Sequence, residues 1–285
     1  LRSILLYSVC VIAMIVITSP GFQNRVHTTS PALYFYIVIF FTGAIRAFAG
    51  PSFSAIISQL VPREILHYAT NISSTTWLAA SITGHASAGF FIAGFGVHIT
   101  FYIILVYVLL SAFLISRIGK KPIVNTQKNI KAWDSVKDGL RFVLNNKIML
   151  GAISLDLFAV LFGGAVALIP EFAEKILMVG PIGFGWLNAA MDIGSVLVIS
   201  TLTLWPMKNK QGYRLMYAVA GFGICIVIFG FSRLYWLSFM ALMIAGMMDG
   251  ISVIVRGTVL QLTTPDDKRG RVSSVNSMFI NSSNE

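Results

Sequence analysis

Long apolar runs recur along the whole chain, and they constrain its fold more than any other feature. An α-helix needs about 20 apolar residues to cross the ~30 Å hydrocarbon layer of a membrane. Because backbone polar groups must be paired inside lipid, each such run predicts a transmembrane helix. We count eight complete runs and the start of a ninth, at roughly residues 3–20, 32–60, 70–95, 99–117, 148–172, 181–205, 213–232, 235–261 and from 272 onward.

The composition agrees with a membrane protein. Hydrophobic residues make up 56% of the chain and charged residues only 11%, whereas soluble domains carry about a quarter charged residues. The net charge of +10 indicates cytoplasmic loops before it indicates a nucleic-acid partner, so none is expected. Cys10 and Cys225 lie inside apolar runs without the spacing of metal ligands, which predicts neither a disulfide nor a metal site.

Basic residues predict the orientation. One set of alternate connections holds sixteen Lys and Arg and the other set holds three, so the first set is predicted to be cytoplasmic. It includes the longest connection, where Trp133, Val136 and Leu140 recur at helical spacing. This pattern predicts an amphipathic helix. We interpret it as a linker helix packing on the underside of the bundle, and lipid sensing is the alternative.

The two parts of the chain repeat one another. A shift of 203 residues places Gly43 on Gly246 and Pro62 on Pro265, and in both copies a long span ends in "QL", Pro and a polar turn. A direct repeat around a long central loop is typical of a transporter with two parallel halves. The predicted divisions are an N-terminal half, a cytoplasmic linker and a C-terminal half: residues 1–115, 116–147 and 148–285.

Three stretches also resemble a known family: "TGAIRAFAGPSFSAIISQLVPRE", "LDLFAVLFGGAVALIPEFA" and "DGISVIVRGTVLQLTTPDDKRGRVSSVNSMFINSSNE". On these residues the chain is similar to the Major Facilitator Superfamily, in the branch of siderophore exporters and macrolide efflux proteins. The resemblance implies an all-α membrane bundle of two pseudo-symmetric halves. It identifies the runs as the third to tenth of twelve helices and the start of the eleventh, so we expect a fragment truncated at both ends.

The chain departs from the family pattern at two places. Exporters of this superfamily often carry a Gly-Pro pair in the fifth span, where this chain has Gly84 and His85. That departure weakens an antiporter inference from this motif, and we interpret His85 as a packed, hydrogen-bonded side chain rather than a proton relay. The loop "MKNKQGYR" keeps Gly212 and Arg214 of the family signature but lacks its acid.

Ionisable groups at membrane depth are costly when unpaired, so each is a candidate for the substrate or proton pathway. Arg46 resembles the superfamily's buried arginine, which is linked to proton coupling, although a role in capping carbonyls is the alternative. A buried carboxylate suits a group that gains and loses a proton. For Asp156 we favour that function over an ion pair between helices, and for Asp192 both interpretations stay open.

Asp249 and Arg256 complete the set of candidates. They stand seven residues apart, so they share a helix face without being direct partners. The repeat suggests that Arg46 meets Asp249 across the pseudo-twofold axis. The substrate is predicted to bind near the midplane, and the expected apolar and aromatic walls come from Phe158, Phe162 and Trp186.

The block "TPDDKRGR" interrupts the apolar sequence near its end. Asp266 and Asp267 are placed to accept hydrogen bonds from amides at the start of the next helix. Arg269 and Arg271 are suited to forked contacts with carboxylates or with carbonyls of a neighbouring span. We interpret these four residues as a cytoplasmic gate latch of the outward-open state. The alternative is a solvated turn that contacts anionic lipids.

No G-x-x-x-x-G-K-[ST] phosphate loop occurs, so ATP hydrolysis by that route is excluded. We predict neither an enzyme nor a cofactor. The expected protein is a monomeric, multi-pass secondary transporter of the bacterial inner (plasma) membrane. It exports an amphipathic small molecule, such as a drug, siderophore or metabolite, in exchange for protons. The alternatives are an uptake symporter of the same fold and a non-transporting membrane receptor or scaffold.

Overall fold

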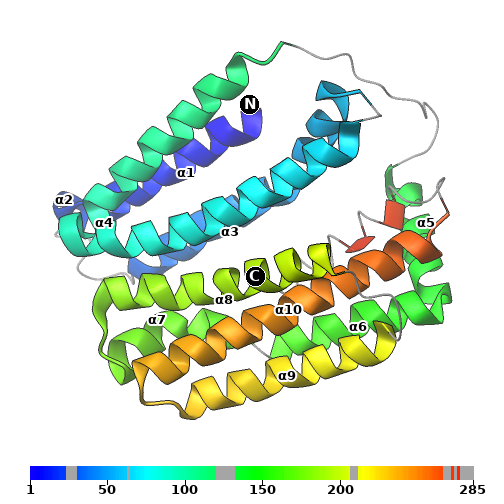
Figure 1. Cartoon of the computed structure of the whole chain (residues 1–285). Helices are drawn as coiled ribbons and strands as arrows, with labels where there is room; N and C mark the ends of the chain where they lie inside the picture. The colour runs from blue at the N-terminus through cyan, green and yellow to red at the C-terminus, as the bar shows by residue number, and fades with distance from the viewer. Residues whose placement is uncertain are drawn as a thin grey trace. The chain divides into compact units, whose positions relative to one another are not determined.

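A computed structural model describes residues 1–23, 31–62, 65–119, 132–162, 164–205, 211–265, 271–272 and 275–276. Every regular element in these ranges is helical (Figure 1), which confirms the predicted all-α fold. The elements are α1 (Arg2–Thr18), α2 (Pro20–Gln23), α3 (Pro31–Leu60), α4 (Leu66–Ser116), α5 (Ala132–Asn145), α6 (Lys147–Phe162), η2 (Gly164–Leu168), α7 (Ile169–Glu171), η3 (Phe172–Ile176), α8 (Gly180–Leu204), α9 (Gln211–Phe231) and α10 (Tyr235–Thr263).

Four helical stretches in the described residues are long and apolar enough to cross a membrane: Ile72–Ser116, Gly180–Leu202, Gly212–Phe231 and Tyr235–Leu260. The first of them contains two of the predicted spans. Gly96 separates these spans, with φ of 78° and ψ of 167° inside α4. Only glycine adopts this conformation without strain, so the break falls where the sequence predicts the turn between residues 95 and 99.

The predicted span at residues 148–172 is not one continuous helix. The α-helix α6 ends at Phe162, and the chain continues through the 3₁₀ turn η2, the short α7 and the π-helix η3. Glycine at position 164 weakens helix propagation. Pro170 lacks the backbone N–H that would bond one turn back and crowds the preceding turn. The apolar run is real, but these two residues change its backbone hydrogen-bonding pattern.

The chain divides into two compact units. The first unit is Leu1–Thr76 with Phe90–Val124, and the second unit is Trp77–Gly89 with Asn125–Glu285. Within the first unit α1 packs on α3 through Cys10, Ile17 and Val38. The second unit takes the linker helix α5 and also a segment of α4 that comes from the N-terminal half of the sequence.

In the second unit α8, α9 and α10 lie side by side with α6 (Figure 1). The closest approach is between α8 and α10. A methyl group on Gly194 would lie 1.9 Å from the carbonyl oxygen of Met243, and one on Gly246 would lie 2.0 Å from that of Met191. These glycines therefore bring the two backbones into contact, as small residues do between membrane helices.

The linker helix α5 packs inside the second unit. Val143 is completely buried and clusters with Met149, Ile153, Val272 and Val275. The Val143 side of α5 thus packs on α6 and on the segment that follows the charged block. Leu140, on the predicted apolar face, is 37% exposed and Leu144 is 52% exposed. The packed surface is therefore narrower than the amphipathic pattern predicts.

Candidate functional site

One face of α4 carries three small or polar residues at four-residue spacing: Ser81, His85 and Gly89. Residues four apart lie above one another on a helix. All three belong to the segment of α4 that groups with the second unit. They form the face that meets α8.

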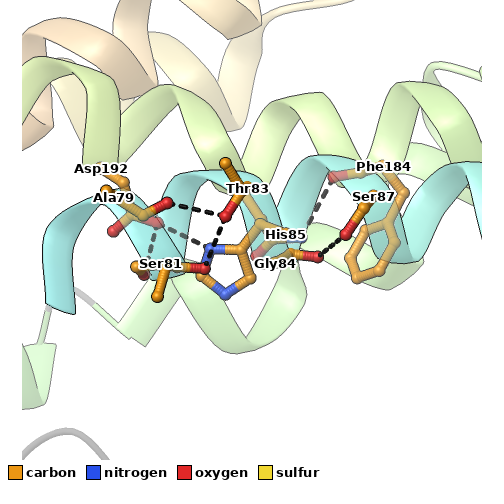
Figure 2. A network of polar contacts seen from close by, with 10 residues as sticks. Ala79, Ser81, Thr83, Gly84, His85, Ser87, Phe184 and Asp192 are labelled. Atoms are coloured by element: carbon orange, nitrogen blue, oxygen red, sulfur yellow. Dashed lines mark hydrogen bonds and ion pairs between the residues drawn. The ribbon is translucent and has the colours of Figure 1, made fainter. Parts of the chain in front are cut away.

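Asp192, near the middle of α8, is the centre of this contact. Its Oδ2 accepts a hydrogen bond from Ser81 Oγ and lies at the same distance, 2.7 Å, from His85 Nδ1. Figure 2 shows both side chains reaching from α4 toward the carboxylate. The Asp192 side chain is 23% exposed and that of His85 is 49% exposed. One carboxylate oxygen therefore holds two partners from another helix.

Glycines explain why the helices come close enough for this contact. A methyl group on Gly89 would lie 2.5 Å from the carbonyl oxygen of Pro181, and one on Gly185 would lie 2.7 Å from that of His85. Gly89 meets Gly185 while Ser81 and His85 meet Asp192, so α4 and α8 run antiparallel here. The polar cluster and the glycine contact are two levels of one helix crossing.

Another side of α8 packs on α10. Ser195 Oγ donates to the carbonyl oxygen of Gly246 at 2.9 Å. Asp249 is half-buried on α10, and Arg256 is buried at 5% exposure two turns further along. The structure thus puts both in the second unit, with the spacing along α10 that the sequence requires.

Other candidates from the sequence are placed less completely. Arg46 lies on α3 in the first unit with an exposed side chain, so its pairing with Asp249 stays a prediction. Trp186 is 38% exposed on α8. The side chains of Asp156, Phe158 and Phe162 lie outside the described part, although their backbone is in α6. Their roles in the pathway and the cavity wall stay predictions.

Of the four residues predicted to form the gate latch, Arg271 lies in the described part of the chain. Asp266, Asp267 and Arg269 lie outside the described residues. Arg271 forms an ion pair through NH1 with Oδ2 of Asp138 on α5. A methyl group on Gly139 would lie 2.9 Å from the carbonyl oxygen of Arg271, so backbone and side chain both meet the linker helix. The partner found here is a carboxylate of the linker, and the latch itself stays a prediction.

An exposed ion pair lies apart from the Asp192 contact. Lys175 Nζ donates to Glu171 Oε1 at 2.7 Å on the exposed segment of α7 and η3, and this hydrogen bond raises the pKa of Lys175 above its usual value. No group of three His, Cys, Asp or Glu in the described ranges has the arrangement of a metal site.

Sequence reasoning missed the partners of Asp192. Ser81 and His85 stand four residues apart, which signals a shared helix face. Nothing in a single sequence, however, shows which helix that face meets. The sequence favours His85 as a packed, hydrogen-bonded side chain rather than a proton relay. The structure shows the hydrogen bond, to a titratable partner, but leaves the side chain 49% exposed. The open question at Asp192, between proton exchange and an ion pair, thus becomes a question about one His–Asp pair.

Comparison with known proteins shows which proteins the chain resembles. A candidate bacilysin exporter, BacE of Bacillus subtilis (strain 168), is 26% identical over 261 residues, which cover 87% of this chain and 65% of BacE. The enterobactin exporter EntS of Escherichia coli O139:H28 is 23% identical over 141 residues, covering 50% of this chain and 34% of EntS. The chain thus spans less than two thirds of the length of these relatives.

The fold comparison gives the same result. The chain resembles the crystal structure of a bacterial homologue of the human lysosomal transporter Spinster, in an inward-facing and unoccupied conformation. The TM-score is 0.65 at 14% identity, with 99% of this chain and 66% of the other covered. The model of the Major Facilitator Superfamily matches residues 1–284. The chain therefore belongs to the Major Facilitator Superfamily of membrane transporters.

Proposed function

We propose that the protein is a secondary active exporter that moves an amphipathic small molecule out of the cell in exchange for protons. Two relatives are named as exporters of small molecules, bacilysin and enterobactin. The observation that carries the coupling to protons is the Ser81–His85–Asp192 contact. It puts two titratable side chains together on apolar helices, where such groups are rare and usually mark a functional site.

The site also suits the way such transporters move. Transporters with repeated halves bind substrate near the membrane midplane and alternate access by rocking one half against the other. His85 belongs to the N-terminal half of the sequence and Asp192 to the C-terminal half. A change in the protonation of this pair therefore acts on a contact between the halves of the repeat. That is the kind of contact through which an ion gradient can drive the cycle.

Transport is tested in everted membrane vesicles from a host that lacks its main efflux pumps. In the absence of ATP, an acid lumen should drive accumulation of an exported probe, and collapsing the pH gradient should stop it. Bacilysin, enterobactin and a panel of amphipathic drugs serve as probes, chosen first by a resistance screen in the same host. Flux in the opposite direction would identify an uptake symporter. The absence of gradient-dependent flux for every probe would favour a receptor or scaffold.

Asp156 is the competing coupling residue. Asp156→Asn and Asp192→Asn are therefore compared in the same vesicles, because an amide keeps the shape of the side chain but cannot carry the proton. Insertion and amount of protein are measured in each membrane. Loss of gradient-driven flux in Asp156→Asn alone would indicate that Asp156 on α6 is the proton-coupling residue. Loss in Asp192→Asn alone supports the contact between α4 and α8.

The proposed location is the bacterial inner membrane with the central loop in the cytoplasm. The excess of Lys and Arg in alternate connections supports this orientation. A cysteine at Asn125, introduced after replacing the buried Cys10 and Cys225, should react with an impermeant reagent only from the cytoplasmic side. Labelling from outside intact cells would reverse the proposed topology.

A further inference from the structure

The His85–Asp192 pair is held by the backbone as well as by the side chains. Gly89 and Gly185 allow α4 and α8 to touch, and a side chain at either position would collide with backbone atoms. With the helix axes this close, His85 Nδ1 reaches Asp192 Oδ2 at 2.7 Å. A contact fixed by packing is pre-organised, because the partners lose little further freedom when the proton position changes.

Few other charges face this pair. Asp192 is the one titratable side chain of α8, and His85 is the one in the α4 segment 77–89. Two elements pack on α8 from other sides, α10 and the α7–η3 segment. Their titratable groups are Tyr235, Asp249 and Arg256 on α10, and Glu171, Glu174 and Lys175 on α7 and η3.

The structure shows where several of these groups lie. Lys175 pairs with Glu171 at the exposed rim. Tyr235 approaches α8 near Gly183, and Asp249 follows Gly246, which meets Met191. Ser81 and His85, which hydrogen-bond to the Asp192 carboxylate, both lie on α4. These two are therefore the side chains of α4 that contact this carboxylate.

We infer that His85, Asp192 and Ser81 form a single proton-binding site, in which His85 Nδ1 and Asp192 Oδ2 hold one exchangeable proton between them. This deepens the proposed function by naming the residues that bind the proton, and it rests on that function for its role in transport.

The proton balance is simple. With the proton bound, an imidazolium faces a carboxylate and the pair has no net charge. When the proton leaves to water, a neutral imidazole remains beside a carboxylate with one negative charge. Ser81 Oγ still donates to that carboxylate, so the anion keeps a hydrogen bond. The charge-assisted contact between α4 and α8 is the stronger one, so proton binding fastens the two helices together.

The site is tested by following the protonation of His85 directly. The chain has four histidines, so histidine-labelled protein in lipid nanodiscs gives few ring signals by NMR, and His85→Gln identifies that of His85. The pH titration is recorded for wild type, Asp192→Asn and Asp249→Asn. We expect the His85 midpoint to change by about tenfold or more in proton concentration in Asp192→Asn, and to stay near wild type in Asp249→Asn.

The controls make each outcome decisive. His98, whose Nδ1 lies 3.0 Å from Thr18 Oγ1 in the first unit, reports whether a variant keeps the fold of that unit. Thermal unfolding reports whether the second unit is folded. If Asp192→Asn does not fold, Ser81→Ala removes one hydrogen bond from the carboxylate and should still change the titration. An unchanged His85 midpoint in a folded Asp192→Asn variant overturns the proposal. An equal change of the His85 midpoint in Asp249→Asn also overturns the proposal. Loss of any nearby carboxylate charge would then explain the change, without a specific contact between His85 and Asp192.

The same variants separate this inference from the proposed function. If His85 and Asp192 share the proton but export does not depend on the pH gradient, the binding site stands and the proposed proton coupling fails. If export depends on the gradient while His85 titrates independently of Asp192, the proposed function stands and this site is wrong.

Discussion

Two ion pairs in the second unit join different helices, and both lie beside a glycine that allows close backbone contact. His85 and Asp192 join α4 to α8 next to Gly89 and Gly185. Asp138 and Arg271 join the linker helix α5 to the segment that follows the charged block, next to Gly139. In each case the glycine allows the two backbones to come close, and the ion pair adds a charged contact between their side chains.

The two pairs differ in whether the cation can lose its proton. An imidazole changes charge between about pH 5 and pH 8, whereas a guanidinium keeps its charge at any pH that a protein experiences. The first pair can therefore respond to a proton gradient and the second cannot. If the proposed proton coupling holds, we expect the first contact to change during the transport cycle and the second to keep the linker attached throughout it.

The largest expected effect is at the pair that can titrate. Asp192→Asn should reduce gradient-driven transport by about 100-fold, and His85→Gln by about tenfold or more, because neither variant can hold the shared proton. Arg271→Lys, which keeps a cation at the other pair, should transport at a rate near that of wild type. The measurement is flux of the selected probe into everted vesicles under an imposed pH gradient. Equal losses of transport in all three variants would contradict the proposal that only the His85–Asp192 pair takes part in proton coupling.

The second prediction concerns the glycine contact under the titrating pair. Gly185→Ala places a methyl group 2.7 Å from the carbonyl oxygen of His85 and 3.1 Å from Cα of Gly89. Forcing these backbones apart should lower the free energy of unfolding by about 1–3 kcal/mol. Gly223→Ala on α9 is the matched control, since nothing lies within 4 Å of its added methyl group.

This control should raise the free energy of unfolding by about 0.5–1 kcal/mol, because alanine is the better helix former. Thermal unfolding of the two purified variants in one detergent measures the difference. A stabilised Gly185→Ala variant would show that α4 and α8 are not in backbone contact at this level.

The same contrast shows what the sequence can and cannot predict. The long apolar runs predict α8, α9 and α10 closely, because length and hydropathy alone decide which helices cross lipid. The break after Phe162 was missed, since a run of apolar residues does not reveal where Gly164 and Pro170 interrupt helical hydrogen bonding. Asp192 stands out as a charge in an apolar run. Its partner His85 is 107 residues away, and no local pattern specifies which helix faces meet.

For the charged block, too, the sequence predicts the chemistry of a contact but not the partner residue. The sequence predicts that Arg271 binds a carboxylate or carbonyl groups, and guanidinium chemistry justifies that. It does not identify Asp138, because the amphipathic pattern of α5 specifies an apolar face without specifying what covers it. The burial of Val143 against Val272 and Val275 supplies that information.

The smallest expected effect is at the Asp138–Arg271 pair. Both side chains keep some exposure, 37% for Asp138 and 23% for Arg271, so solvent weakens the interaction. A double-mutant cycle with Asp138→Asn and Arg271→Gln should give a coupling of about 0.5–1 kcal/mol in the free energy of unfolding.

The cycle also tests the gate latch that the sequence suggests at this block. If the pair only attaches the linker, exchanging the charges with Asp138→Arg and Arg271→Asp should restore part of the stability and leave cavity cysteines equally accessible from the cytoplasm. If Arg271 instead latches the outward-open state, Arg271→Ala should increase that accessibility, with a coupling of about 1–3 kcal/mol between gate and cavity. Increased accessibility that the charge exchange does not reverse would assign Arg271 to the gate, and the contrast between a responsive and a constant pair would then fail.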